Sequence, residues 1–161
     1  MGPKRPRTKP GLMNRRSSRR HCFCIVYQLV FWKNLTAQEL YRLYTNEFLS
    51  QDAPPDENPP SVSIPKGEAA FMLEIAVGVD ETREFLDSTI EKHTSGWSLA
   101  RLARVDLAIL RMAIYELAFT PNTPTSVIIN EAIELAKLYG DDEAPAFING
   151  LLASASKNLR G

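Results

Sequence analysis

Apolar residues at helical spacing dominate the first part of the chain. Residues 15–32 contain no glycine or proline, and Cys22 and Val26 fall on one helical face together with further apolar residues. A second helix should begin at Thr36, because Glu39 three residues later completes a capping box in which each side chain satisfies a free backbone N–H group. These patterns predict two consecutive helices.

The middle of the chain combines a proline-rich stretch with further helical patterns. Residues 51–67 contain five prolines and no apolar periodicity, which predicts an exposed loop because proline lacks the N–H group and fixes φ. The pattern over residues 72–90 predicts two helices, or one helix that is kinked at Gly78. Residues 102–119 are apolar on nearly every face, so we expect this helix at the centre of the fold.

The C-terminal part predicts two more helices. An amphipathic pattern over residues 127–139 stops at Gly140, a common residue just beyond a helix end. The acidic residues 141–143 then precede a final apolar stripe, and negative charge stabilises a helix N-terminus. Because no segment alternates with period two, the sequence predicts an all-α bundle of about six or seven helices.

Charge divides the chain into two unlike parts. The net charge is zero, yet residues 1–38 hold nine of the 19 basic residues and none of the 19 acidic ones, which leaves residues 39–161 at −9. Residues 1–14 are basic and proline-rich and predict a flexible arm, whereas residues 15–161 should form the helical domain. A basic end favours polyanions, and an acidic body favours a basic protein partner.

Four arginines give the strongest local signal for binding. Arg15, Arg16, Arg19 and Arg20 lie within an arc of about 140° at the start of the first predicted helix. Four cations there oppose the helix macrodipole, and a polyanion would relieve this conflict. Guanidinium groups also suit bidentate contact with phosphate and stacking on unpaired bases. We therefore interpret the four arginines as one phosphate-binding face; a solvated basic end is the simpler alternative.

The sequence contains no recognisable catalytic or metal-binding motif. It lacks a nucleophile elbow, a phosphate-binding loop, a dinucleotide fingerprint and a zinc-protease motif. His21 and His93 have no neighbouring carboxylate or cysteine pattern of the kind that a triad or a zinc site needs, so we expect both on the surface. We predict a protein that is not an enzyme and that needs no cofactor and no metal.

Cysteine usage and hydropathy favour a cytoplasmic protein without membrane contact. Cys22 and Cys24 would point about 200° apart on a helix, too far round to pair. The longest apolar run, residues 22–32, is far shorter than the ~20 residues of a membrane helix. A basic and then apolar start could also suggest a secretory signal, but no cleavage site follows residue 32.

Three further residues have a structural interpretation on pattern alone. Tyr27 and Phe147 stand at helical spacing among apolar residues, which is typical of core positions. Arg111 lies inside the central apolar helix and must find an acid there. We expect Glu131 or Glu116 to be its partner.

Several stretches together resemble the NusB family of transcription antitermination factors. They are RRSSRRHCFCIVY (15–27), VDLAILRMAIYEL (105–117), INEAIELAKLYG (129–140) and FINGLL (147–152). Their order and spacing fit the family over essentially everything from Arg15 onward. This chain departs from the family at Cys24, where glutamine is common, at Ser17 and Arg20 in the arginine motif, and in its longer proline-rich loop and basic extension.

The resemblance implies an all-α protein of two helical subdomains that binds single-stranded, boxA-type RNA of ribosomal RNA transcripts. It also implies that the protein binds the small-subunit ribosomal protein NusE and joins other Nus factors on RNA polymerase. The family's RNA contacts correspond here to Arg15, Arg16, Arg19, Arg20 and Phe147, and its NusE contacts to Tyr27 and Asp106.

Two alternatives remain at this point. NusB-like domains also occur as RNA-targeting modules of ribosomal RNA methyltransferases, and the absence of a nucleotide-binding strand and loop favours a stand-alone factor. A helical self-association module is the other alternative, since some family members form homodimers.

Overall fold

The computed structural model describes residues 13–48 and 64–161, and within these ranges all regular structure is helical. The helices are α1 (Arg15–Phe31), α2 (Ala37–Phe48), α3 (Lys66–Glu81), α4 (Arg83–Lys92), α5 (Arg104–Phe119), α6 (Thr125–Tyr139) and α7 (Ala144–Arg160), with a 3-10 turn at Leu99–Arg101. The prediction of an all-α bundle is confirmed for the described part of the chain. None of the described helices is long and apolar enough to cross a membrane.

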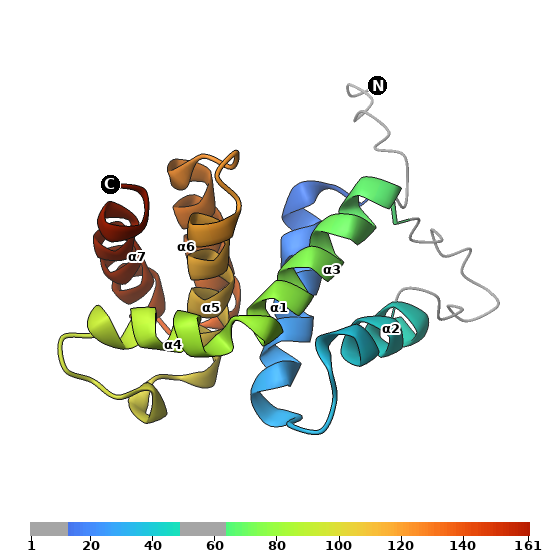
Figure 1. Ribbon diagram of the computed structural model, residues 1–161, viewed down its shortest axis with the longest axis horizontal. Helices are drawn as coiled ribbons and strands as arrows, with labels where there is room; N and C mark the ends of the chain where they lie inside the picture. The colour runs from blue at the N-terminus through green and yellow to red at the C-terminus, as the bar shows by residue number, and fades with distance from the viewer. Residues whose placement is uncertain (1–12, 49–63) are drawn as a thin grey trace, which may run out of the picture.

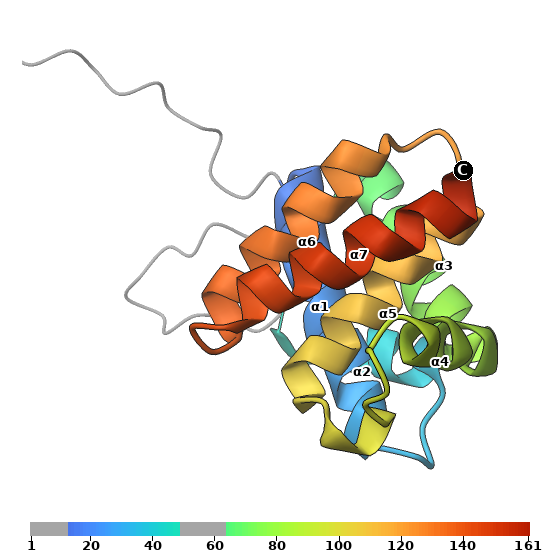
Figure 2. The ribbon, with the colours of Figure 1, turned by 90° about the vertical axis from the view of Figure 1, so that its left-hand side faces the viewer.

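The helices form two groups that meet at α1 and α5. On the right of Figure 1, α1, α2 and α3 contact one another, while α5, α6 and α7 form the group on the left. α4 runs along the lower edge and contacts α5. Figure 2 shows α7 beside α6. Every residue of α5 from Asp106 to Leu117 is buried, which confirms the central position predicted for this helix.

The break between α3 and α4 falls at Thr82 and not at Gly78. Gly78 is buried inside α3, and a Cβ atom there would overlap the ring of Tyr115 on α5. Glycine therefore allows α3 and α5 to approach closely, and it introduces no kink. The two predicted helices are present, but the sequence misplaced their junction by four residues.

Capping bonds define the starts of α1 and α2. The predicted box at α2 is present: the backbone N–H of Glu39 donates to Thr36 Oγ1 (3.2 Å), and that of Thr36 donates to Glu39 Oε2 (2.7 Å). At α1, Ser17 N–H donates to Asn14 Oδ1 (2.9 Å), and Met13 is buried. Met13 and Asn14, the last two residues of the expected arm, therefore pack against or cap the start of α1.

The remainder of that arm, residues 1–12, lies outside the described residues, as do residues 49–63 of the expected loop and its flank. Lys66 and Gly67, which were expected in the loop, already belong to α3.

The turn from α6 to α7 is set by Gly140 and Asp141. Gly140 has φ −90°, so it is not left-handed; instead, a Cβ atom there would lie 2.6 Å from Ala144 Cβ. Asp141 Oδ1 accepts from the backbone N–H groups of Glu143 and Ala144, both at 3.0 Å. The negative charge predicted at the start of the last helix is therefore a capping carboxylate.

Candidate nucleic-acid interface

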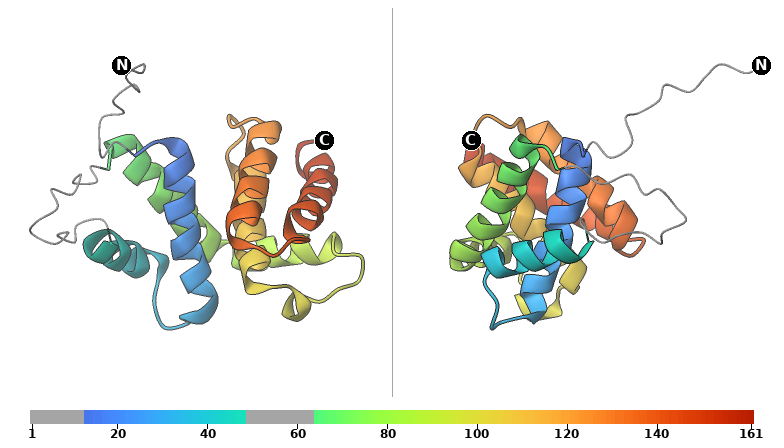
Figure 3. Two further views of the ribbon diagram at one scale, coloured as in Figure 1. Left: turned by 180° about the vertical axis from the view of Figure 1, so that it is seen from behind. Right: turned by 90° about the vertical axis from the view of Figure 1, so that its right-hand side faces the viewer.

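α1 has two unlike faces, and the predicted binding residues are divided between them. One face is buried and includes Arg19. The other face carries a row of side chains that we call the outer stripe: Arg16, Arg20, Tyr27 and Phe31. Spacings of four and seven residues keep these side chains on one side of the helix. Figure 3 (left) shows α1, in blue, next to α6, in orange.

Arg19 belongs to the buried face, so the expected surface of four exposed arginines is wrong at this position. Only 5% of its side chain is exposed, and its Nη2 lies 2.8 Å from Oε1 of Glu116 on α5. A second bond joins Arg19 Nε to Glu116 Oε2 at 3.3 Å. The sequence held a signal for this placement, because Arg19 precedes Cys22 and Val26 by three and seven residues on the apolar face.

Arg15 and Arg16 are partly exposed and also meet carboxylates. Arg15 Nε lies 3.0 Å from Glu68 Oε2 on α3, and its guanidinium lies 3.9 Å from the ring centroid of Phe71. Arg16 Nη2 lies 3.1 Å from Glu131 Oε1 on α6. About half of each arginine side chain remains exposed, 49% and 56%. The start of α1 is therefore tied to three other helices by Arg–Glu pairs.

Arg20 is exposed and differs from the other three arginines. Within the described residues it makes no ion pair. The next residue, His21, is half-buried, so the expected surface position is only partly confirmed; its Nδ1 lies 2.5 Å from the hydroxyl oxygen of Tyr44. Burial and then the charge of Arg20 lower the pKa of His21. The other histidine, His93, is half-buried as well.

Arg111 is buried as expected, but its partner differs from both candidates. Its guanidinium makes two hydrogen bonds, of 2.8 and 2.9 Å, to the carboxylate of Asp87 on α4. Glu116 and Glu131 are instead engaged by Arg19 and Arg16. The predicted role of Arg111 in a structural ion pair is correct. The predicted partner is wrong, because both candidate glutamates form ion pairs with arginines of α1.

Tyr27 lies half-buried in the middle of the outer stripe. Its ring stacks on Phe23 with centroids 5.8 Å apart, and it meets Phe31 edge-on at 5.1 Å. Tyr27 is therefore only partly in the core, in contrast to the core position that we predicted. An aromatic row with one side open is a surface on which a partner could pack.

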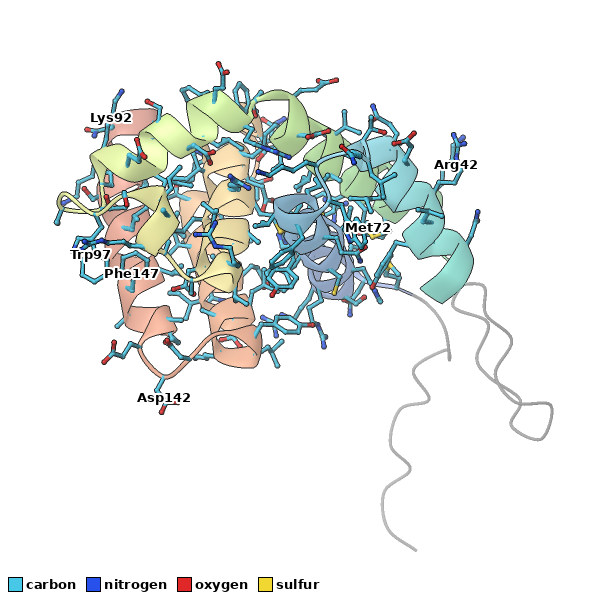
Figure 4. The ribbon with its side chains drawn as sticks, turned by 90° about the horizontal axis from the view of Figure 1, so that it is seen from below. Arg42, Met72, Lys92, Trp97, Asp142 and Phe147 are labelled. Atoms are coloured by element: carbon cyan, nitrogen blue, oxygen red, sulfur yellow. The ribbon has the colours of Figure 1, made fainter. Side chains whose placement is uncertain are left out.

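Phe147 and Asp106 line the same cavity although they were expected to serve different partners. The cavity holds about 440 Å³, and its lining includes the exposed Trp97, Arg101 and Asp141. Figure 4 shows Trp97 and Phe147 close together on one side of the molecule. Phe147 is half-buried, so it too is not a full core residue.

Asp106 is an acid held in an unfavourable environment. It is 8% exposed, and burial, together with the charge of Asp141, raises the pKa of its carboxyl group. A cation or a hydrogen-bond donor supplied by a partner would relieve this cost. The acidic wall of the cavity therefore suits a basic group better than a phosphate.

Neither a metal site nor a reactive thiol is apparent in the part of the chain that the structure describes. No group of three or more histidine, cysteine or acidic side chains there could hold a metal ion. Cys22 and Cys24 are both free, and burial raises the pKa of each thiol, which favours the unreactive protonated form.

Comparison with known proteins identifies the family. The NusB family model matches residues 16–157. The transcription antitermination protein NusB of Acetivibrio thermocellus is 37% identical over 145 residues, which covers 90% of each chain. The solved structure of T. maritima NusB aligns with a TM-score of 0.76 and 29% identity over 90% of this chain and 92% of that one.

A second solved structure contains antitermination factors NusB and NusE in complex with double-stranded RNA. It aligns with a TM-score of 0.72 and 24% identity over 89% of this chain and 96% of that chain, and so has the same fold. Since the family model spans nearly all described residues and a close relative matches almost end to end, this chain belongs to the NusB family.

Proposed function

We propose that this protein is a transcription antitermination factor that binds single-stranded, boxA-type RNA of ribosomal RNA transcripts together with NusE. The names of its relatives support the general activity. The observation that carries the RNA part is the outer stripe of α1. There Arg20, which makes no ion pair with any described residue, and the half-exposed Arg16 lie on the same side of the helix as Tyr27.

The proposed RNA contacts are Arg15, Arg16, Arg20 and Phe147. Arg15 and Arg16 each keep about half of their surface in solvent, so N–H groups remain for phosphate beside their ion pairs. Phe147 offers an aromatic ring at the edge of the cavity, where an uncharged base could stack without bringing its phosphate against the acidic wall. Arg19 would act indirectly, because its bond to Glu116 fixes the helix that presents the others.

The proposed NusE contacts are Tyr27 and Asp106. Residues 39–161 carry a net charge of −9, which suits a basic ribosomal protein. In a solved structure of the same fold, NusB was found with NusE and double-stranded RNA. The resulting complex would join other Nus factors on RNA polymerase in the cytoplasm, and a homodimer through the same face is the alternative assembly.

A filter-binding experiment tests this function. It compares a boxA-type RNA with a scrambled RNA of equal length, each with and without NusE, at one fixed salt concentration. We expect NusE to tighten binding of the boxA-type RNA by about 5- to 150-fold, the usual range of coupling between two ligands. Equal weak binding in all four conditions would remove antitermination as the function. Measuring the mass in solution with and without RNA separates self-association from heteromeric assembly.

A thermodynamic cycle tests the Asp106 contact. Asp106→Lys should weaken NusE binding by charge reversal and leave the weak RNA binding of the isolated protein intact or slightly stronger. Asp142→Lys is a matched control, because Asp142 is an exposed acid that does not line the cavity (Figure 4). Asp106→Asn removes the charge but keeps the shape of the side chain, so an effect on NusE binding in this variant cannot be attributed to misfolding. If NusE tightens RNA binding equally in all of these proteins, Asp106 does not contact NusE.

A further inference from the structure

Arg20 stands between two hollows on the side of the molecule where α1 meets α6. One hollow, of about 240 Å³, is lined by Ser17, Arg20, His21, Cys24, Tyr44 and Tyr139. The other, of about 190 Å³, is lined by Arg16, Arg20, Glu131, Glu134, Leu135 and Leu138. In the described residues Arg20 has no carboxylate partner, so a cation without a counter-charge borders both hollows.

The two hollows differ in the ligand charge that they tolerate. In the second hollow Glu131 and Glu134 offset the charges of Arg16 and Arg20, so its lining carries no net positive charge to hold a phosphate. Among the described residues, no acid lines the first hollow, and Arg20 is the charged group that lines it at neutral pH. An anionic ligand held by Arg20 is therefore favoured in the first hollow.

Tyr139 supplies an aromatic platform in the first hollow. The residue is 42% exposed, and its ring stacks on Phe23, with centroids 4.7 Å apart and planes 20° apart. Because Phe23 is buried, its stacking contact holds the Tyr139 ring in one orientation even without a ligand. A fixed ring beside a free guanidinium is the combination that single-stranded nucleic acids use for stacking and phosphate contact.

His21 adds a hydrogen-bonding group to the same hollow. Its Nδ1 is engaged by Tyr44, while Nε2 makes no hydrogen bond within the described residues. Because burial lowers the pKa of His21, its imidazole is neutral at pH 7 and can bond to a base or a ribose without adding charge.

We propose that the first hollow holds one nucleotide of a single-stranded RNA, with its phosphate on Arg20 and its base stacked on Tyr139. This inference rests on the proposed RNA-binding function and names the nucleotide site within it. Arg20 and Tyr27 are seven residues apart, or about 10 Å along the helix axis. An RNA strand anchored here therefore lies within reach of a protein bound at Tyr27.

The test uses a boxA-type RNA in which 2-aminopurine replaces one base at a time, with and without NusE. In the wild-type protein, one position should be quenched by stacking on Tyr139. Tyr139→Ala should abolish that quench and weaken binding by about 5- to 150-fold, the range for loss of one base–aromatic stack. Tyr139→Phe should retain both. Arg20→Ala should flatten the slope of log affinity against log salt by ~0.7, the value for one single-strand phosphate contact.

Two matched variants control for general effects. Phe85→Ala removes a ring of nearly equal exposure, 43%, on α4. Arg42→Ala removes an exposed cation on α2, at the opposite end of the molecule from Phe147 (Figure 4). Both should keep the quench and the wild-type salt slope.

Three results would overturn the inference. If the wild type binds RNA and neither Tyr139→Ala nor Arg20→Ala changes the binding, the nucleotide site is wrong while the proposed function stands. If the two variants lose NusE affinity instead of RNA affinity, a protein occupies the hollow. If the wild type binds no RNA with or without NusE, the proposed function fails as well.

Discussion

Arg19 and Arg20 are neighbours in one basic motif, yet they occupy opposite environments. Arg19 is 5% exposed and bonded to a buried glutamate, whereas Arg20 is exposed and makes no ion pair in the described residues. The difference arises because successive helical residues point about 100° apart, which places Arg19 towards α5 and Arg20 towards solvent. One basic motif can thus contain arginines that stabilise the fold and arginines that are available to bind a ligand.

Ion pairs reduce the positive charge that the sequence suggests for the start of α1. Arg15, Arg16 and Arg19 each meet a glutamate from the acidic body. The basic start of α1 is therefore largely neutralised by glutamates of other helices, and Arg20 keeps the least compensated charge of the motif.

Arg19→Ala should destabilise the protein most, by about 3 to 5 kcal/mol, because it leaves Glu116 charged and buried without a partner. Urea midpoints measure this loss. The double variant Arg19→Met with Glu116→Leu removes both charges and should be nearly neutral, since apolar pairs often replace buried ion pairs without cost. A loss below about 1 kcal/mol in Arg19→Ala would show that Arg19 is not an internal support.

Arg111→Ala should cost somewhat less, about 2 to 3 kcal/mol. Its partner Asp87 keeps 21% of its side chain exposed, so water can reach the abandoned carboxylate, unlike Glu116 at 4%. The same urea series compares the two buried pairs directly. Equal losses in both variants would mean that residual exposure does not set the cost.

Arg16→Ala should leave the unfolding free energy almost unchanged. Its side chain is 56% exposed, and exposed ion pairs contribute little because solvent screens them. Its effect should appear in RNA affinity instead. An Arg16→Ala variant as unstable as Arg19→Ala would contradict the division of the motif into two faces.

His21 should give a small pH dependence of stability. Its folded pKa is lowered, so the unfolded chain binds more protons; the stabilisation is present above about pH 6.5 and is lost as pH falls below that value. Between pH 7.5 and 5.5 the wild type should lose up to about 1.4 kcal/mol more than His21→Gln. Because the charge of Arg20 is a second cause of the shift, NMR titration of Arg20→Ala should show a higher pKa for His21.

Local features of this fold were predictable, and long-range pairings were not. The Thr36–Glu39 box was predicted because it needs only four consecutive residues. The burial of Arg19 could have been predicted from its spacing of three residues from Cys22. The prediction failed because the four arginines were treated as one exposed group. The Arg111–Asp87 pair depends on how α4 crosses α5, which no sequence spacing specifies.

The candidate site follows the same rule. The outer stripe can be traced from the sequence because it lies on one helix. The hollow beside Arg20 cannot, because Tyr139 reaches it from α6 and Tyr44 from α2. Sequence spacing indicates which residues share a helix face, whereas packing decides which faces meet.

The salt dependence of RNA affinity in two variants tests the central claim most directly. Arg20→Ala and the Arg19→Met/Glu116→Leu double variant each remove one arginine from the same helix turn, but only the first removes an exposed cation. We predict that the slope of log affinity against log salt flattens by ~0.7 in Arg20→Ala and stays at the wild-type value in the folded double variant. A flattened slope in the double variant with an unchanged slope in Arg20→Ala would contradict this account.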